Sequence, residues 1–288
     1  MIDVLILNYN DAETTLSYVN RVANYNVIHK ILIVDNCSTD DSVNLFKSFK
    51  NKKVEVVESK KNGGYGAGNN IGIKYLIKKY DSDYILISNP DVIVEEDTII
   101  HLETFLRNHL DYAIAAPFML DKNYKRQINT AFKIPDLYDY ILSFDMFWTK
   151  YQSNSIYDNI IKEEADYKTV DGVSGSMLMI NAKNMMNYGM YDENIFLYCE
   201  EISLAIKLKK AKMKTALLPK YGFVHNHSIS ISKTYNSELK KQKLLVESKL
   251  YVIKHYYNAN SFAYLCAWLM SKISIIETII WSKVRRLK

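Results

Sequence analysis

Short apolar runs alternate with amphipathic stretches in the first part of the chain. The apolar runs predict five strands, at residues 4–7, 31–34, 54–57, 84–87 and 112–116. Between them, apolar residues three and four positions apart predict helices, at about residues 12–25, 38–49, 69–79 and 98–108. Ser38 and Asp41 resemble a capping box that would begin the second helix. The alternation predicts an α/β fold, with a Rossmann-like, mostly parallel sheet flanked by helices on both faces.

The pattern is less regular after Pro117. An aromatic-rich stretch up to about residue 167 predicts loops and short helices. Further along, the chain predicts a strand-like segment at 170–180, a helix at 202–213, a strand at 216–218 and a polar loop at 221–232. Two terminal helices are then expected, at 238–257 and 262–284. The second is apolar but contains Lys272 and Glu277, so we interpret it as too polar to cross a membrane.

Composition and charge narrow the class of protein. Of the 288 residues 48% are hydrophobic, which is ordinary for a globular protein with a sizeable core. The net charge of +5 is mild and concentrates near the C-terminal end, so no nucleic-acid partner is expected. Cys37, Cys199 and Cys266 are far apart and predict neither a disulfide framework nor a zinc site, which fits a cytoplasmic protein. The chain begins directly with an apolar run, so no signal peptide is expected.

Polar side chains follow each of the first four predicted strands. In chain order they are Asn8 and Asn10, then Asp35, then Asn62 with a glycine-rich segment, then Asn89 and Asp91. Each residue alone is ordinary turn chemistry. Because ligands bind beyond the carboxyl ends of parallel strands, the whole set predicts a binding site at one edge of the sheet.

The glycine-rich segment NGGYGAGNN covers residues 62–70. Gly63 and Gly68 have the spacing of a Walker A loop, but Asn69 and Asn70 stand where Lys and Ser/Thr are required, which excludes a P-loop. The segment instead predicts a loop whose bare backbone approaches a nucleotide before a helix begins, with a simple tight turn as the alternative.

Asp91 is the candidate metal ligand. A carboxylate would repel a diphosphate unless a divalent cation lay between them, and Mg²⁺ or Mn²⁺ accepts both carboxylate and phosphate oxygens. Pro90 restricts its own φ and favours an extended Asn89, which helps to aim the Asp91 side chain. Since Mn²⁺ also accepts imidazole, His225 and His227 are both candidates for a second ligand.

Glu200 and Glu201 open the helix predicted after residue 199. Two acidic residues at a helix N-terminus are favoured by the helix dipole, so plain capping accounts for them as well as function does. Two adjacent carboxylates at such a junction also suit a catalytic base held toward a cleft.

Taken together, these motifs resemble family 2 glycosyltransferases of the GT-A fold, in the rhamnosyltransferase-like and galactofuranosyltransferase-like branch. The matching segments are ILNYN, ILIVDNCSTDDS, KNGGYGAGNNIGI, YILISNPDV, VDGVSGSMLMI, FLYCEEISL and FVHNHSIS, which occur in the family's order over about residues 3–232. The resemblance implies a catalytic domain at 1–232, with a nucleotide-sugar half at about 1–117 and an acceptor half at about 118–232. Residues 233–288 would form a C-terminal helical extension.

The resemblance also implies roles for individual residues. Asn8, Asn10 and Asp35 would lie at the nucleotide, with Asp35 bonded to the base. The donor pocket would include Asn62, Gly63, Gly64, Gly68, Asn69, Asn89, Gly175 and Ser176. Asp91 and His225 would hold Mn²⁺ or Mg²⁺, although Asn89 replaces the first acid of the usual Asp-x-Asp. Glu201 would be the catalytic base, with Glu200 as the alternative because the family's usual pair is Glu-Asp.

The implied reaction is an inverting transfer from a nucleoside-diphosphate sugar to a saccharide or lipid-linked saccharide, in cell-surface polysaccharide synthesis. The donor could be dTDP-rhamnose, UDP-galactofuranose or a UDP-hexose. The terminal helices would contact the inner face of the cell membrane. The alternative is that they pack on the catalytic domain or on a second copy of the chain in a homodimer. Two other classes are weighed: a sugar-nucleotide pyrophosphorylase, whose basic glycine-rich loop after the first strand is absent, and a non-catalytic nucleotide-sugar binding module.

Overall fold

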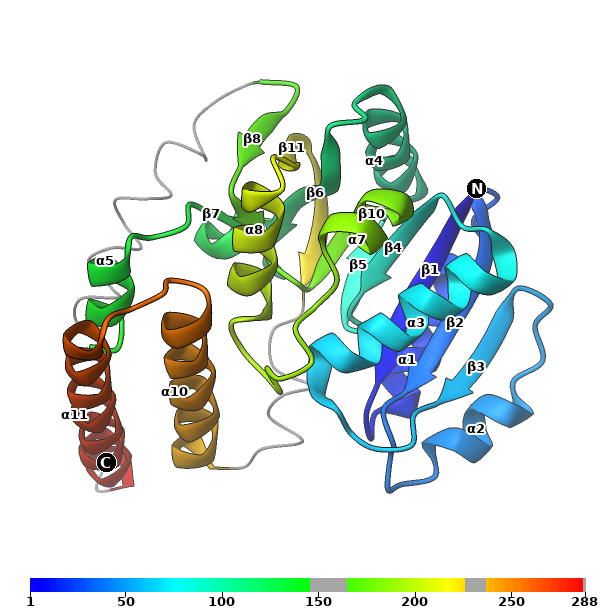
Figure 1. The fold of residues 1–288 in the computed structure, drawn as a ribbon. Coiled ribbons are helices and arrows are strands. Elements are labelled where there is room, and N and C mark those ends of the chain that lie inside the picture. The colour runs from blue at the N-terminus through cyan, green and yellow to red at the C-terminus, as the bar shows by residue number, and fades with distance from the viewer. Residues whose placement is uncertain (146–164, 226–236, 287–288) are drawn as a thin grey trace.

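A mixed β-sheet forms the centre of the computed structural model, which describes residues 1–145, 165–225 and 237–286 (Figure 1). Within these ranges the sheet has nine strands, in the order β3-β2-β1-β4-β10-β6-β11-β5, with β8 paired to β11. The strands are β1 (Ile2–Asn8), β2 (Ile28–Asp35), β3 (Val54–Glu58), β4 (Tyr84–Ser88), β5 (Val92–Val94), β6 (Tyr112–Leu120), β8 (Lys168–Val170), β10 (Met177–Asn181) and β11 (Lys214–His225). A small second sheet pairs β7 (Ala131–Phe132) with β9 (Gly172–Val173).

The parallel part of the sheet confirms the predicted fold class. Strands β1, β2, β3 and β4 are mutually parallel, and β6 is parallel to β11. Strand β10 joins these two groups because it is antiparallel to both β4 and β6. All five strands predicted before Pro117 are present, each within a few residues of its expected bounds.

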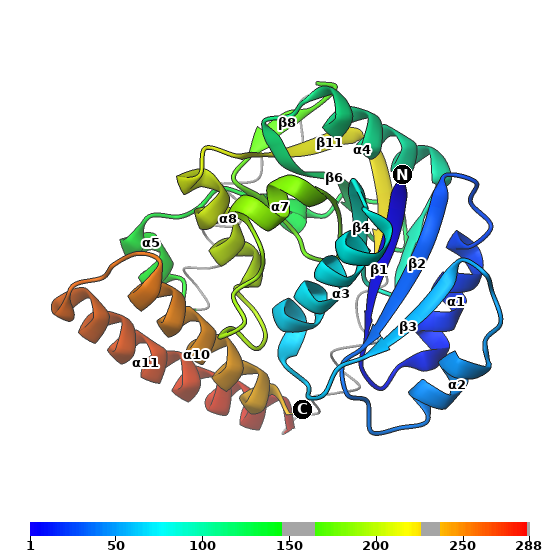
Figure 2. The same ribbon diagram turned by 45° about the vertical axis from the view of Figure 1, so that its right-hand side comes forward.

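Helices cover both faces of the sheet, which explains why the strands are continuous apolar runs (Figure 2). One face carries α1 (Ala12–Val22), α2 (Ser42–Ser48) and α4 (Glu96–Asn108). The other face carries α3 (Gly64–Tyr80), α7 (Ala182–Tyr188) and α8 (Glu200–Lys210). In β1 the side chains of Val4 and Ile6 join the first core and that of Leu5 joins the second, and all three are fully buried. Alternate side chains of one strand therefore supply two separate cores.

Three local predictions were wrong. Helix α3 begins at Gly64, so most of the glycine-rich segment predicted as a loop is helical. Helix α2 begins at Ser42 after the N-cap Asp41, whose side chain makes no capping bond, so no capping box forms there. The Ser38 hydroxyl is used elsewhere, as described below. The predicted polar loop at 221–232 is also corrected over its described part, because β11 continues to His225.

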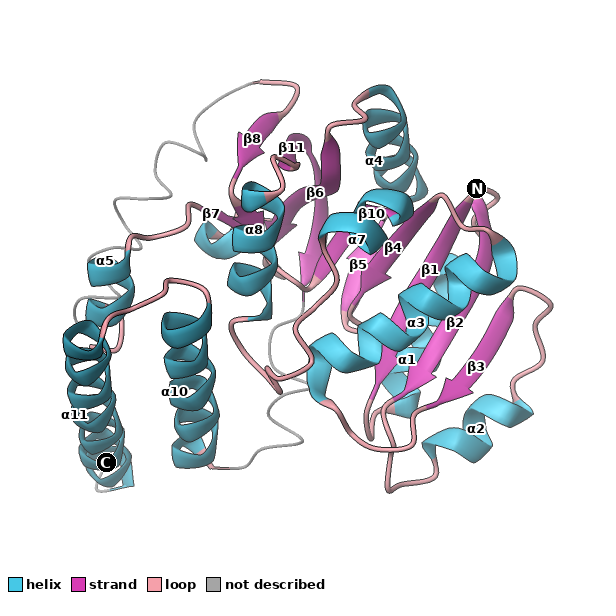
Figure 3. Ribbon diagram, viewed as in Figure 1, coloured by secondary structure: helices cyan, strands magenta, loops and turns pink. Residues whose placement is uncertain are grey.

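A third cluster of apolar side chains joins the C-terminal extension to the rest of the molecule. Helices α5 (Leu137–Leu142), α10 (Glu238–His255) and α11 (Ser261–Arg286) pack together beside the sheet domain (Figure 3). The short 3-10 helix η1 (Ile128–Thr130) precedes β7. Val252 and Ala267 are fully buried in this cluster, and Ile195 of the segment before α8 belongs to it. The extension thus shares a core with the chain that leads to Glu200 and Glu201.

The outer side of α11 is apolar and exposed. It carries Phe262, Leu265, Leu269, Ile273, Ile276 and Ile280, which lie three or four residues apart and are each 45–75% exposed. Contrary to the expectation from Lys272 and Glu277, the helix is long and apolar enough to cross a membrane by length and composition. Only 22% of its apolar window is buried. Membrane contact and pairing with a second copy both stay predictions.

Candidate active site

The ends of β1 and β2 are joined by a buried polar network. Asn8 lies opposite Asp35 in the parallel register, and Asn8 Nδ2 donates a 2.9 Å hydrogen bond to Asp35 Oδ1. The Ser38 hydroxyl donates to Asp35 Oδ1 at 2.6 Å, and the Ser38 N–H donates to Asp35 Oδ2 at 2.8 Å. Thr15 Oγ1 donates to Asn8 Oδ1 at 2.9 Å. Both predicted residues are 1% exposed, so their side chains shape this end of the sheet from within.

Asn10 continues this network toward the surface. Its φ of 54° places it in the left-handed region, which asparagine tolerates better than most residues. Its N–H donates to the Ser38 hydroxyl at 2.9 Å, and its Oδ1 accepts from the Thr39 N–H at 2.7 Å. Asn10 is therefore the member of the first predicted group with partial exposure. The assignment of Asp35 to the nucleotide base stays a prediction, and both its oxygens are bonded within the chain.

Asn36 connects β2 to the start of α3 and was not among the site residues predicted from the sequence. It is 3% exposed, and its Nδ2 donates to Asn62 Oδ1 at 2.9 Å and to the Gly64 carbonyl at 3.1 Å. Asn62 Oδ1 also accepts from the Gly64 N–H at 3.0 Å. Asn36 could have been selected from the sequence because it directly follows Asp35, among the polar residues after the second predicted strand. Asn36 and Asn62 together fix the entry to α3.

The glycines of α3 are packed closely against neighbouring segments. Gly64 has a φ of +85°, and a Cβ there would lie 1.9 Å from the Phe196 carbonyl oxygen. A Cβ on Gly68 would lie 2.3 Å from Leu7 Cδ1 of β1. Asn69 is fully buried, and its Nδ2 donates to the Tyr65 carbonyl one turn earlier. Gly68 and Asn69 thus lie inside the helix against the sheet, and their donor-binding role stays a prediction.

Asp91 and His225 lie close together where β11 pairs with β5. Residue His225 of β11 is paired with Val92 of β5, which places it beside the turn that carries Asp91. The distance between His225 Nε2 and Asp91 Oδ1 is 3.2 Å, and the two residues are 8% and 9% exposed. The other imidazole candidate, His227, lies outside the described residues.

This pair fits a divalent cation. Neighbouring ligands of an octahedral Mg²⁺ ion with bonds of 2.0–2.1 Å lie about 3 Å apart, close to the separation of the two side-chain atoms. Asp91 Oδ1 makes no hydrogen bond with the described residues, so a lone pair is available to a metal ion. No group of three or more His, Cys, Asp or Glu side chains gathers within the described ranges. A cation held by Asp91 and His225 would therefore take its remaining ligands from phosphate and water.

Residues 174–176 connect the Asp91 turn to the acidic pair. The Asn89 N–H donates to the Ser176 carbonyl at 2.8 Å. On the other side, the Gly175 N–H donates to Glu201 Oε1 at 3.2 Å. A Cβ on Gly175 would lie 2.8 Å from that same Oε1, so a larger residue here would displace the Glu201 carboxylate. The structure thus links Asn89, Ser176, Gly175 and Glu201, which the sequence analysis proposed separately.

Glu200 and Glu201 differ in their surroundings. Glu200 is 3% exposed, its Oε1 makes no hydrogen bond with the described residues, and burial together with the Glu201 charge holds its pKa well above the ordinary value. Burial also raises the pKa of Glu201, while its own N–H and that of Gly175 oppose this shift. The N–H of Glu200 likewise opposes the shift at Glu200, but only Glu201 also accepts a bond from Gly175.

We expect Glu200→Gln to increase the free energy of unfolding at pH 7 by about 1 kcal/mol or more. The amide keeps the cost of an unsatisfied neutral group, about 1–3 kcal/mol, but avoids the larger cost of burying a charge. The helix dipole favours Glu200 by only about 0.3–1 kcal/mol, so burial decides the sign. Because the folded-state pKa of Glu200 is raised, its contribution to stability is present below pH 4.5 and is lost as the pH rises above this value. Glutamine removes this contribution, while that of Glu201 remains, so the variant should lose less stability between pH 4.5 and pH 7 than the wild type does.

Urea unfolding at pH 4.5 and pH 7 measures this difference. Glu247→Gln, the same change at an exposed position of α10, is the matched control and should alter neither value. Lower stability of Glu200→Gln at pH 7 would contradict the burial argument.

A strained turn presents the two glutamates. Tyr198 and Cys199 have positive φ angles of 69° and 67°, a backbone conformation that is unfavourable for residues other than glycine. The extension holds this turn, since Ser248 Oγ of α10 donates to the Leu197 carbonyl at 2.7 Å. Tyr140 Oη of α5 donates to Cys199 Sγ at 3.3 Å. Contacts from α5 and α10 therefore stabilise a conformation that the turn alone disfavours.

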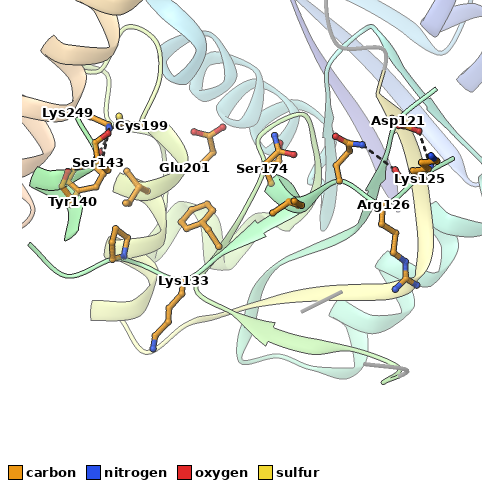
Figure 4. Close-up of a pocket in the computed structure, with 16 residues that line it drawn as sticks. Asp121, Lys125, Arg126, Lys133, Tyr140, Ser143, Ser174, Cys199, Glu201 and Lys249 are labelled. Carbon is orange, nitrogen blue, oxygen red and sulfur yellow. Dashed lines mark hydrogen bonds between the residues drawn. The ribbon is translucent and has the colours of Figure 1, made fainter. Parts of the chain in front are cut away.

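Glu201 lines an open cleft of about 790 Å³ (Figure 4). Its walls come from the segment around β7, from Ser174, from the turn before α8 and from α10. Neither Asp35 nor Asp91 is among the residues that line it. Residues 174–176 therefore lie between the Asp91–His225 pair and Glu201, which faces the cleft.

The fold and the arrangement of the site define the class of protein as a GT-A glycosyltransferase. A helix-flanked, mostly parallel sheet carries polar residues at its strand ends and a carboxylate pair beside a cleft. Residues 3–185, more than half of the chain, match the sequence profile of the family described as "Glycosyl transferase family 2". The chain belongs to this family.

Two curated relatives agree with this assignment. Rhamnosyltransferase WbbL of Escherichia coli K12 is 29% identical over 168 residues, which cover 56% of this chain and 60% of WbbL. The low-salt glycan biosynthesis hexosyltransferase Agl10 of Haloferax volcanii is 23% identical over 228 residues, which cover 79% of this chain and 68% of Agl10. The chain is thus similar to rhamnosyl- and hexosyltransferases of family 2.

Solved structures share the fold. GalNAc-T7, crystallised with UDP, GalNAc and Mn²⁺, has a TM-score of 0.57 at 12% identity, over 92% of this chain and 55% of that chain. S. aureus TarS 1-349 in complex with UDP has a TM-score of 0.55 at 14% identity, over 96% of this chain and 80% of that chain. At these identities the likeness establishes the architecture alone.

Proposed function

We propose that this protein transfers a sugar, with inversion, from a nucleoside-diphosphate donor to a hydroxyl group of a saccharide or lipid-linked saccharide. The observation that carries the proposal is the continuous connection from the Asp91 turn through Ser176 and Gly175 to Glu201 in the cleft. This connection gives one site with a place for a diphosphate and a carboxylate on the acceptor side.

In this proposal Glu201 is the base. Its carboxylate accepts the proton of the acceptor hydroxyl as that oxygen forms a bond to the anomeric carbon of the donor, and the bond to the diphosphate breaks. The Gly175 N–H holds Oε1, which leaves the other carboxylate oxygen for the acceptor. Burial raises the pKa of Glu201, which makes it a stronger base than an exposed glutamate.

Asp91 and His225 would hold Mn²⁺ or Mg²⁺, which neutralises charge on the departing diphosphate when it is bound. The polar network of Asn8, Asn10 and Ser38 would shape the nucleotide end, with Asn62 and Gly63 beside it. GalNAc-T7 was crystallised with Mn²⁺ and UDP, which supports a divalent cation and a nucleotide donor for the fold.

The relatives favour a sugar donor of a particular kind. WbbL is named a rhamnosyltransferase and Agl10 a hexosyltransferase of glycan biosynthesis, so dTDP-rhamnose and UDP-hexoses are the first donors to try. The name of Agl10 supports a role in glycan biosynthesis, and we propose that the product is a cell-surface polysaccharide. Family membership favours transfer over the pyrophosphorylase alternative, and the position of Glu201 in the cleft favours an enzyme over a binding module.

We also propose that residues 1–232 form the catalytic domain and that residues 233–288 form an extension that completes its cleft. The shared core of Ile195, Cys199 and Val252 supports this division, because the extension packs on the turn before α8.

Thermal unfolding with a panel of sugar nucleotides, with and without Mn²⁺, tests the proposed function. A true donor at one hundred times its Kd should add about 2.7 kcal/mol to the free energy of unfolding, a rise of several degrees in Tm. The matching nucleoside monophosphate with EDTA is the control. A folded chain that no sugar nucleotide stabilises, with either Mn²⁺ or Mg²⁺, would contradict the proposal.

A further inference from the structure

Lys249 of α10 lines the same cleft as Glu201, although it lies in the C-terminal extension. Its Nζ donates hydrogen bonds to the Ser143 carbonyl at 2.6 Å and to Ser143 Oγ at 2.9 Å. The ammonium also lies over the rings of Tyr140 and Phe144, 5.7 Å and 5.1 Å from their centroids. Lys249 is therefore held in one position at the cleft wall.

The partners of Lys249 are all uncharged. The salt bridges of the described residues include other lysines, such as Lys209 and Lys214, but not Lys249. Burial lowers its pKa to about 8, and the nearby Cys199 thiol is the group that opposes this shift. The side chain thus remains largely protonated at neutral pH, at a cost that no carboxylate in the described ranges offsets. Since an ammonium has three N–H donors, the two bonds to Ser143 leave one for a further partner.

The charge of the whole cleft also favours an anionic ligand. Its lining includes the cations Lys125, Arg126, Lys133 and Lys249, against the two carboxylates of Asp121 and Glu201. Asp121 Oδ1 already accepts from the N–H groups of Asn123 and Lys125. Arg126 is engaged elsewhere, because its Nη2 donates to the Pro219 carbonyl at 2.9 Å and its side chain extends away from Glu201 in Figure 4. The cleft lining therefore carries a net positive charge, to which Lys249 contributes the cation held beside Ser143.

We propose that Lys249 binds an anionic group, a phosphate or a carboxylate, of the substrate that occupies this cleft. This inference rests on the proposed function in one respect: the substrate in the cleft is taken to be the acceptor. The Lys249 ammonium would place the acceptor relative to Glu201, so the C-terminal extension would contribute to specificity. A purely structural lysine, which only fastens α10 to Ser143, is the competing explanation.

Binding of inorganic phosphate and of acetate to the full chain, measured by calorimetry at constant ionic strength, separates the two explanations. We expect Lys249→Met to weaken binding of the anion about tenfold, the usual effect of losing one hydrogen bond to a charged group. Lys249→Arg should retain most of the affinity. Lys254→Met, on the exposed side of the same helix, is the matched control and should bind as the wild type does.

Two further arms identify the site and the ligand chemistry. Asp91→Asn should leave this binding unchanged, since neither Asp91 nor His225 lines the cleft. Binding of phosphate but not acetate assigns a phosphate group, and the reverse assigns a carboxylate. Anion binding that survives Lys249→Met and is lost in Asp91→Asn would overturn the proposal.

A measurement on the unsubstituted chain covers the case in which Lys249→Met does not fold. Acetylation of Lys249, followed by mass spectrometry, should be about tenfold slower in saturating phosphate or acetate than in chloride of equal ionic strength. Lys254 should react at the same rate in both. Equal rates at Lys249 would overturn the proposal. Neither experiment requires sugar transfer, so failure of this inference is distinguishable from failure of the proposed function.

Discussion

Replacement of Glu201 by glutamine is expected to lower kcat by about 10²–10⁴-fold, the contribution of a positioned general base. The amide has nearly the same shape and can still meet the Gly175 N–H, but it cannot accept the proton of the acceptor hydroxyl. Donor affinity should be retained, because Glu201 faces the cleft rather than the Asp91 turn. Initial rates with a donor found in the panel, together with calorimetric donor binding, measure both quantities.

The controls for this variant separate the two glutamates. Glu200→Gln tests the alternative base, and Glu247→Gln repeats the substitution at an exposed position. Because the pKa of Glu201 is raised, kcat/KM of the wild type should fall on the acidic side at a pH above 4.5, and this limb should disappear in Glu201→Gln. Full turnover in Glu201→Gln with loss in Glu200→Gln would transfer the base role to Glu200.

Replacement of Asp91 by alanine is expected to weaken donor binding and Mn²⁺ binding together, by about 10–100-fold or more. Loss of a partner that only orients a metal ligand already costs this much, so loss of a direct ligand should cost at least as much. His225 would then stand without the carboxylate 3.2 Å away. Calorimetric titration of the donor, with and without Mn²⁺, measures the coupled loss.

Asp97→Ala is the matched control, because it removes an exposed carboxylate six residues further along the chain. It should leave both affinities unchanged. An Asp91→Ala chain that is folded and binds donor with wild-type affinity would refute the metal assignment.

The strands and the polar strand ends were predictable because two simple rules govern them. Side chains such as Leu5 and Ile6 are buried on opposite faces of the sheet, so each strand is a continuous apolar run that is easily found. Parallel strands also end at one edge, which brings Asn8 beside Asp35. The approach of His225 to Asp91 depended on the pairing of β11 with β5, which no local pattern revealed.

Other parts of the site depend on contacts between segments that are distant in the sequence. Gly68 was predicted for a ligand, but a glycine needed for packing against Leu7 looks the same in a sequence. Ser38 resembled a helix cap, yet its hydroxyl bonds Asp35. Nothing near Lys249 in the sequence indicated a place beside Glu201, since the third core that brings them together is formed by α5, α10 and α11.

The contacts between α10 and the turn before α8 affect the order in which the protein becomes functional. Ser248 bonds the Leu197 carbonyl, and Tyr251 and Tyr256 both bond Asp192, so the glutamates are held by residues that the ribosome adds after them. The N-terminal sheet can fold during translation before α10 emerges. A nascent chain could therefore gain a nucleotide pocket early while the proton acceptor is still imprecisely placed, which delays turnover until synthesis has passed α10.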